Sequence, residues 1–273
     1  MNFLKKKKED FRETNILNDK ANIIALFGKI NDKGRLINFE QTLQDGEEFQ
    51  EFDLELIWEA QSKFFFIGEG ETPFDQACLL RFSNSNELCK FYKSDLLKKL
   101  KEDFKKNNNE LEVLFIKERI LPLPLKFVGT IFKTIGKIIP FSKFKNKEKN
   151  DFENLGGINP RPDQYKGLDS SNLEGPLHMI NFLSFRGKEG FSDYQKYGLI
   201  ALRGVLLLGG RLAFLGRVID ETYDHWNQIA IMEYPSVESF KDLVHMPGYS
   251  KATFWRAKGL LKTLLIISKP SKK

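Results

Sequence analysis

Apolar and polar positions follow the same order in the two halves of the chain. An apolar run typical of a buried strand spans residues 22–30 in the first half and 177–185 in the second. Each run is followed by a predicted helix with two aromatic residues three positions apart. These residues are Phe49 and Phe52 in the first half, and Tyr194 and Tyr197 in the second. The second helix continues as a stripe at helical spacing, which indicates one apolar face.

The next elements recur as well. Two apolar strands lie within residues 64–91, and two more lie within residues 212–243. In each half the later strand begins at a glutamine, Gln76 or Gln228. A cluster of Ser, Asn or Pro residues then predicts the cap of a helix. A last apolar strand follows each helix, so both halves have the order β-α-β-β-α-β.

This order predicts an α+β fold with two tandem ferredoxin-like domains. The helices of such a domain cover one face of a four-stranded antiparallel sheet, and the other face needs a cover. We expect the two sheets to pair as an intrachain α/β barrel, with the domains joined by an amphipathic helix. The predicted divisions are a basic N-terminal tail (1–21), a degenerate domain (22–118), a helix and linker (119–174) and a second domain (175–269).

The central segment has the pattern of a cationic amphipathic helix. Apolar residues such as Phe132 lie along one side, and lysines including Lys126, Lys133 and Lys137 lie along the other. Such a helix can lie in the interface of an anionic membrane, with its lysines on the headgroups. It can equally pack against its own two domains, as most amphipathic helices do. Both hypotheses stay open.

Charge and cysteine content narrow the cellular setting. The 273 residues carry a formal net charge of +6 and only two cysteines, Cys78 and Cys89. This excludes a disulfide scaffold and is typical of a reducing compartment. No secretory signal is predicted, because no apolar segment follows the basic residues near the start of the sequence. No transmembrane segment is predicted either, because the most apolar stretch, 198–216, contains two arginines. We therefore expect a cytoplasmic protein, with peripheral contact at the inner face of a membrane as a further hypothesis.

The second copy resembles a known family. The likeness rests on PLHMINFLSFR (176–186), YQKYG (194–198), GGRLAFLGR (209–217), WNQIAIMEYPSVESF (226–240), MPGY (246–249) and Arg256. In this order the motifs resemble the domain-of-unknown-function 1330 family of the dimeric α/β-barrel superfamily, over residues 175–268. The resemblance implies a ferredoxin-like fold whose sheets pair into a barrel, and it implies no established reaction. Residues 22–118 look like a diverged second copy.

Polar residues of the second copy stand opposite apolar residues of the first. The aligned pairs are Asn181 with Leu26, Tyr194 with Phe49, Tyr197 with Phe52, Trp226 with Phe74, and Arg256 with Phe104. We therefore expect a ligand-binding pocket in the second copy, formed by its five polar or amphipathic residues, with the first copy as scaffold. An exposed or partner-bound face would produce the same pattern.

Each candidate also has a purely structural interpretation. The Asn181 amide needs partners when buried, and a ligand, a backbone group or a tyrosine hydroxyl would serve. The planar guanidinium of Arg256 suits a carboxylate or phosphate, or a structural ion pair with Glu233 or Asp242. The two tyrosines suit a core, and Trp226 suits a packing anchor at a strand start.

No motif identifies a cofactor, metal or nucleic acid. The histidines are not spaced as metal ligands, although Asn181, Trp226 and His245 could surround a heme in a heme-degrading site. The leading hypothesis is a small-molecule-binding or enzymatic α/β-barrel protein, with a homodimer as one candidate assembly. A non-catalytic interaction or assembly module is the alternative. A monooxygenase-like enzyme is the second alternative, and it rests on superfamily analogy alone.

Overall fold

The computed structural model describes residues 13–30, 39, 41, 47–68, 73–106, 109–121, 123–139, 158–219 and 226–270. Its centre is a closed barrel of antiparallel strands in the order β1-β3-β2-β8-β5-β7-β6-β4. The strands are β1 (Ile23–Lys29), β2 (Leu54–Ile67), β3 (Gln76–Phe82), β4 (Glu110–Glu118), β5 (Leu177–Phe185), β6 (Arg211–Val218), β7 (Gln228–Tyr234) and β8 (Leu260–Pro270). The prediction of an α+β chain with a barrel closed within one chain is confirmed.

The two halves of the chain contribute equal parts of the barrel. The first half supplies neighbouring strands in the order β4-β1-β3-β2, and the second half supplies β8-β5-β7-β6. Two seams join them. At one seam β2 pairs with β8, where Ala60 lies opposite Pro270. At the other seam β4 pairs with β6, where Ile116 lies opposite Val218. Each edge strand of one half is thus paired by an edge strand of the other.

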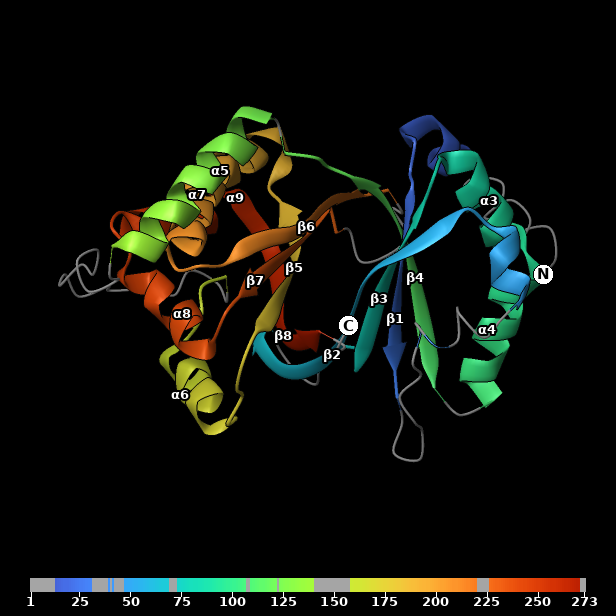
Figure 1. Ribbon diagram of the computed structural model, residues 1–273, viewed down its shortest axis with the longest axis horizontal. Helices are drawn as coiled ribbons and strands as arrows, with labels where there is room; N and C mark the ends of the chain where they lie inside the picture. Colours follow the sequence, from blue (N-terminus) through green and yellow to red (C-terminus); the bar gives the residue numbers. More distant parts are fainter. Residues whose placement is uncertain are drawn as a thin grey trace.

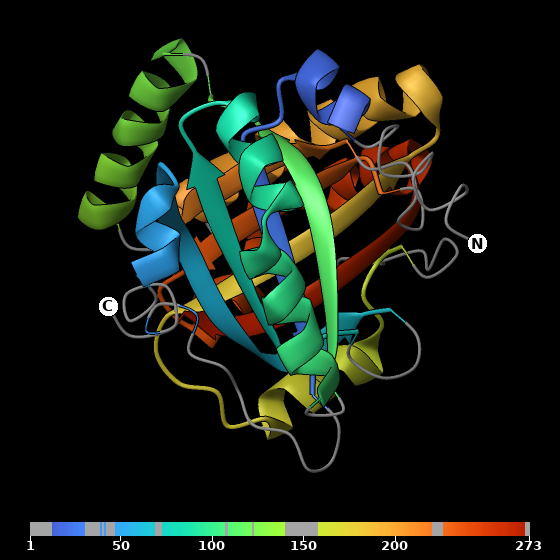
Figure 2. The same cartoon turned by 90° about the vertical axis from the view of Figure 1, so that its right-hand side faces the viewer.

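Helices cover the outside of the barrel, as Figures 1 and 2 show. Those of the first half include η1 (Glu47–Glu51), α3 (Ser85–Lys93) and α4 (Asp95–Lys106). Those that follow are α5 (Leu123–Ile138), α6 (Pro162–Ser170), α7 (Gly187–Leu207), α8 (Val237–Asp242), η3 (Leu243–His245) and α9 (Tyr249–Gly259). In Figure 1, α3 and α4 flank one side of the barrel, and α5 to α9 flank the other.

Two predicted segments differ from the structure. The predicted helix around Phe49 and Phe52 is a single 3-10 turn over Glu47–Glu51, with Phe52 beyond its end. Residues 13–19 of the predicted tail are helical, and Ile16 is fully buried in the core of the first half. An apolar side chain placed there joins the core, because burial of an isoleucine stabilises the fold by about 2 kcal/mol.

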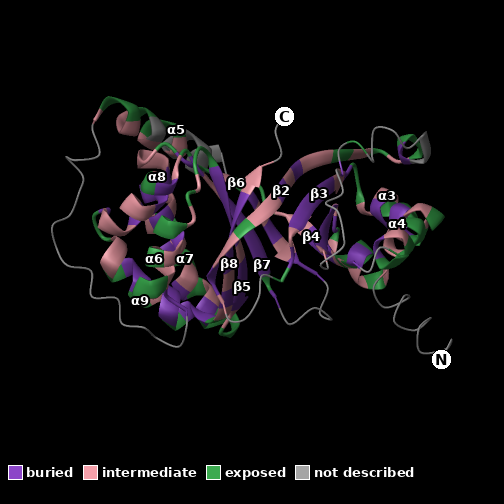
Figure 3. Cartoon of the chain, turned by 90° about the horizontal axis from the view of Figure 1, so that it is seen from below, coloured by how far each residue is buried: buried purple, intermediate pink, exposed green. Residues whose placement is uncertain are grey.

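The interior of the barrel is filled with apolar side chains. Alternate residues of the strands point inward, so that Ile180 and Phe182 of β5 meet Phe27 of β1 and Trp226, which lies just before β7. The ring centroids of Phe182 and Trp226 are 5.7 Å apart. Figure 3 shows that the strands are mostly buried, in contrast to the outer faces of the helices. The barrel interior is therefore a packed core.

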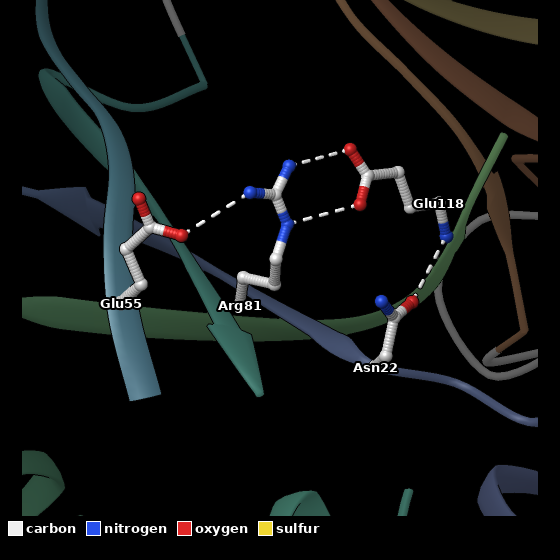
Figure 4. A network of polar contacts seen from close by, with 4 residues as sticks. All are labelled: Asn22, Glu55, Arg81 and Glu118. Carbon is white, nitrogen blue, oxygen red and sulfur yellow. Dashed lines mark hydrogen bonds and ion pairs between the residues drawn. The ribbon is translucent and has the colours of Figure 1, made fainter. Parts of the chain in front are cut away.

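A polar network ties together the ends of three strands in the first half (Figure 4). Arg81 of β3 donates two hydrogen bonds to the carboxylate of Glu118 in β4, at 3.0 and 2.6 Å. Its third nitrogen donates to Glu55 of β2 at 3.2 Å. The backbone N–H of Glu118 in turn donates to the Asn22 side chain at 3.2 Å, just before β1. The planar fork of arginine suits this paired arrangement.

Helix α5, the predicted amphipathic helix, lies beside α7 (Figure 1). Its glycines face α7, where a Cβ on Gly136 would collide with the carbonyl oxygen of Leu207. Its outer side exposes Ile131, Lys137 and Ile138, and Phe132 is half-buried. The side chains of Lys126 and Lys133 lie outside the described residues. Among the described residues, no helix is long and apolar enough to cross a membrane.

Candidate functional site

A cavity of about 560 Å³ lies between the sheet of the second half and its helices. Its floor is the outer face of β5 and β7, including Met179, Ala230 and Met232. Helices α7 and α9 form much of its wall. Exposed Ile120 and Leu199 line its open side, and buried Arg256 and Tyr234 line its inner part.

Four of the five predicted ligand-binding residues line this cavity. Asn181 projects from β5, Tyr194 and Tyr197 from α7, and Arg256 from α9. The fifth residue, Trp226, lies in the barrel core instead, with Lys262 Nζ 4.6 Å from its ring centroid. Its position agrees with the packing anchor that the sequence left as an alternative.

Close packing of α7 on α9 brings the tyrosines and the arginine together. A Cβ on Gly190 of α7 would lie 2.6 Å from the carbonyl oxygen of Gly259, and a Cβ on Gly259 would lie 2.5 Å from that of Gly190. Only glycine permits so close an approach of two backbones. The guanidinium carbon of Arg256 consequently lies 5.8 Å from the ring centroid of Tyr197.

The Asn181 side chain has its donor satisfied by the sheet. Its amide nitrogen donates to the carbonyl oxygens of Met179 and Ala230, at 3.0 and 3.3 Å. This fixes which end of the amide carries the nitrogen, because a carbonyl accepts and does not donate. The Asn181 carbonyl oxygen is then the group offered to the cavity.

Arg256 is almost completely buried, with an exposed fraction of 4%. Its Nη1 donates to the backbone oxygen of Ile158 and, at 3.2 Å, to the Asn159 side-chain oxygen. The predicted alternative of an ion pair with Glu233 or Asp242 does not occur. Glu233 instead accepts from Arg211 at 2.6 Å, with His178 at 3.2 Å.

Five tyrosines line the cavity: Tyr165, Tyr194, Tyr197, Tyr234 and Tyr249. The hydroxyls of Tyr197 and Tyr249 lie 3.2 Å apart. Burial raises the pKa of Tyr165 and of Tyr194 far above the usual phenol value, and Tyr197 adds to both effects. Burial likewise raises the pKa values of Tyr234 and Tyr249. All four therefore remain neutral phenols at physiological pH.

Several cavity residues were not identified by comparing the sequences of the two copies. Tyr165 comes from α6, within the predicted linker, and Arg119 follows β4 of the first half. Arg119 donates to the Gln228 side chain at 3.4 Å and lies 5.2 Å from the Phe191 ring centroid. Tyr249 belongs to the MPGY motif, which was the one available signal for it. For Tyr165 and Arg119, which lie outside the second copy, no sequence pattern pointed to the cavity.

The residues required by the heme hypothesis do not meet. Asn181 lines the cavity, Trp226 lies inside the barrel, and His245 of η3 does not line the cavity. Over the described residues, no group of three His, Cys, Asp or Glu side chains is placed to hold a metal ion. The cavity wall also contains no carboxylate, lysine or histidine among the residues that the structure describes.

The corresponding space in the first half is filled. Leu26 and Phe104 are both buried in the core between the first-half sheet and its helices. The ring of Phe104 stacks on Phe39, with centroids 6.2 Å apart. The two halves therefore differ at these positions: Leu26 and Phe104 fill the first half, whereas Asn181 and Arg256 line a cavity in the second.

Comparison with known proteins gives limited similarity. No family model matches the chain, and no curated protein matches it. A protein of unknown function from Rhodopseudomonas palustris is 28% identical over 42% of this chain and 98% of its own, with a TM-score of 0.38. An anthrone oxidase-like protein is 9% identical over 93% of this chain and 92% of its own, with a TM-score of 0.47.

Chlorite dismutase from Candidatus Nitrospira defluvii is also similar. It is 10% identical over 95% of both chains, with a TM-score of 0.42. Scores this low establish no activity for the chain. Its resemblance to the domain-of-unknown-function 1330 family therefore stays a prediction.

Proposed function

We propose that the second half of the chain binds a small, largely apolar molecule in the cavity between its sheet and its helices. The observation that carries this proposal is the cavity itself, about 560 Å³ with mainly apolar walls and a few polar groups. Ligand sites of small molecules have this size and this balance of apolar and polar groups. Asn181 and Arg256 are the polar contacts, and Tyr194 and Tyr197 are wall residues.

We further propose that each half is a ferredoxin-like unit and that the first serves as scaffold. The recurring strand orders β4-β1-β3-β2 and β8-β5-β7-β6 support this proposal. The likeness of residues 175–268 to the domain-of-unknown-function 1330 family belongs to the same proposal. Because the barrel closes within one chain, it needs no second copy to complete it, and a homodimer would use another surface.

Native mass spectrometry of protein purified gently from its own host tests the binding proposal. The unaltered protein should carry a reproducible small mass, and Gly198→Phe should lose it. Gly198 lines the cavity, and a Cβ built there meets no atom within 4 Å, so a phenyl group has space to enter. Gly198→Ala is the matched control and should keep the mass. A mass retained by Gly198→Phe would place the ligand elsewhere.

Whether binding leads to a reaction is a separate question. The alternative of a non-catalytic assembly module predicts no cavity ligand and no effect of Gly198→Phe on partner binding. The monooxygenase-like alternative predicts turnover of the bound molecule with consumption of oxygen. Oxygen uptake by the protein together with its extracted ligand distinguishes the monooxygenase-like alternative from simple binding, and absence of the native mass would favour the assembly module.

Membrane contact through α5 is a second candidate function. It is supported by exposed Ile131 and Ile138 beside exposed Lys137, an apolar surface with a cationic neighbour. Co-sedimentation with anionic liposomes tests it. Replacement of Lys126, Lys133 and Lys137 by Glu should abolish binding because the headgroups are anionic. Equal binding by the altered protein would rule out this role. A location in the cytoplasm, at the inner face of a membrane, belongs to the same proposal.

A further inference from the structure

Arg256 places a buried positive charge in a wall that offers no negative charge. Its exposed fraction is 4%, and its described hydrogen bonds go to a backbone carbonyl and an amide oxygen. Its guanidinium also lies 5.8 Å from the Tyr197 ring centroid, so all of these described contacts are with neutral groups. No described carboxylate lies within salt-bridge distance of it. Taking a cation out of water without an opposite charge costs several kcal/mol. The fold therefore maintains an unfavourable charge at this position.

The other cavity residues cannot supply the missing charge. The described lining contains no aspartate or glutamate. The four tyrosines with raised pKa values stay protonated, since burial disfavours the phenolate. An anion that compensates Arg256 must therefore enter the cavity from solution.

Asn181 adds a second requirement. Its amide nitrogen is occupied by the carbonyls of Met179 and Ala230, so only its oxygen is available. No described residue donates to that oxygen. A carbonyl oxygen recognises a hydrogen-bond donor and cannot recognise a carboxylate. The two polar groups thus select different parts of a ligand.

We propose that the cavity binds a monocarboxylic acid that has an apolar body and a hydroxyl group. This inference rests on the proposed function and names the class of ligand for the same cavity. The carboxylate meets the guanidinium of Arg256, and the hydroxyl donates to the oxygen of Asn181. A single buried guanidinium matches one negative charge, and its planar fork matches a carboxylate.

The rest of the cavity fits the body of such a molecule. Methionines and aliphatic residues form the floor, and Tyr194, Tyr197 and Tyr249 present aromatic walls. Flat aromatic rings pack favourably on such side chains. Arg119, at the exposed side, lies outside the buried part and is not needed for the charge match.

Three fluorescent probes separate the two contacts. These are 6-hydroxy-2-naphthoate, its neutral amide 6-hydroxy-2-naphthamide, and 2-naphthoate, which lacks the hydroxyl. At neutral pH the unaltered protein should bind the hydroxy acid at least about tenfold more tightly than the amide, because a hydrogen bond to a charged group contributes about 1.5–3 kcal/mol. It should bind 2-naphthoate about three- to tenfold more weakly, because a neutral hydrogen bond is lost.

Variants assign each preference to its residue. Arg256→Met should bring the ratio of acid to amide affinity close to one, and Asn181→Leu should remove the preference for the hydroxyl. Arg256→Lys keeps the charge and should keep a weakened preference for the acid, so the test remains decisive if Arg256→Met does not fold. Glu55→Gln is the control, because this exposed side chain does not line the cavity, and it should leave all three affinities unchanged.

Two outcomes overturn the inference. Equal affinity for acid and amide in the unaltered protein would show that Arg256 serves only to hold α9 against residues 158–159. Failure of the hydroxy acid to bind at all would also reject this ligand class. The proposed function fails separately, when the native mass found with the purified protein survives Gly198→Phe.

Discussion

Leu26 and Asn181 occupy the same position in their strands. Gly28 of β1 lies opposite Gln76, and Leu183 of β5 lies opposite Gln228. Leu26 and Asn181 each lie two residues before these partners of a glutamine. Both therefore project from the outer face of the barrel towards the helices, since side chains two apart share a face. The leucine is buried in a core, and the asparagine lines a cavity.

Replacing each of these residues by the other residue type, in two single variants, should have unequal effects on the free energy of unfolding. Asn181→Leu should change the free energy of unfolding by less than about 1 kcal/mol, because the cavity has room for the side chain. Leu26→Asn should destabilise the protein by about 2–4 kcal/mol, because it places an amide in a packed apolar core. Urea denaturation of both variants measures the difference. Equal losses would mean that the two sites are equally packed.

Two glycines of α7 should respond in opposite ways to alanine. Gly198→Ala should stabilise the protein by about 0.5–1 kcal/mol, since alanine is the better helix former and a Cβ there meets open space. At Gly190 a Cβ would lie 2.6 Å from the backbone carbonyl oxygen of Gly259, which cannot move aside as a side chain can. Gly190→Ala should therefore lower the melting temperature, whereas Gly198→Ala should raise it. A loss of stability in both variants would contradict the open space at Gly198.

The buried His178 should make stability depend on pH. Its Nδ1 accepts a hydrogen bond from Trp58 Nε1 at 2.6 Å, so that nitrogen cannot take up a proton without loss of this bond. Burial lowers the pKa of His178, although neighbouring Glu233 partly opposes the shift and Arg211 adds to it. In the pH range just below the ordinary histidine value of about 6.5, the unfolded chain therefore binds more protons than the folded chain.

Stability should consequently fall as the pH is lowered through that value and level off below the folded pKa. Thermal unfolding between neutral and mildly acidic pH measures this effect. His178→Gln supplies an acceptor for Trp58 that does not titrate, so the variant should show a flatter profile over the same range. An unchanged profile would assign the pH dependence to other groups.

The stability that the Arg81 network contributes should depend on the geometry of its hydrogen bonds more than on its charges. Arg81→Lys keeps the charge but loses the paired hydrogen bonds to Glu118, and should cost about 1 kcal/mol. Glu55→Gln is the control. Because the Glu55 side chain is 67% exposed, its loss should cost less than about 0.5 kcal/mol. Equal effects in chemical denaturation would show that the fork to Glu118 contributes nothing special.

The sequence predicted the barrel because its signal is repeated. Each half supplies strands with an apolar inner face, and each such face needs a cover that the other half provides. The comparison of the copies picked out Asn181 and Arg256, which line the cavity, because a polar residue at an apolar position is informative. That they bind a ligand stays a prediction. Trp226 gave the same signal but points into the core, because the period of a strand does not say which face is enclosed by the barrel.

The rest of the site depends on tertiary packing that no local pattern records. Arg119 and Tyr165 reach the cavity from residues 119–174, which the sequence assigned to the helix and linker, so a search within the second copy could not find them. The sequence also did not decide which surface α5 contacts, because an amphipathic stripe suits a membrane and a neighbouring helix alike. Its two glycines, which weaken an isolated helix, permit the close contact with α7.

The position of β8 has a consequence for synthesis on the ribosome. This strand follows all the others in the chain, yet it pairs with β2 on one side and β5 on the other. The barrel consequently cannot close until β8 has emerged from the exit tunnel. Until then the nascent chain presents an unpaired edge at β2 and an uncovered apolar face, which are the features that chaperones recognise and that drive aggregation. Slow translation of the central segment would lengthen this exposure. The risk of aggregation is therefore greatest in the interval before β8 is synthesised.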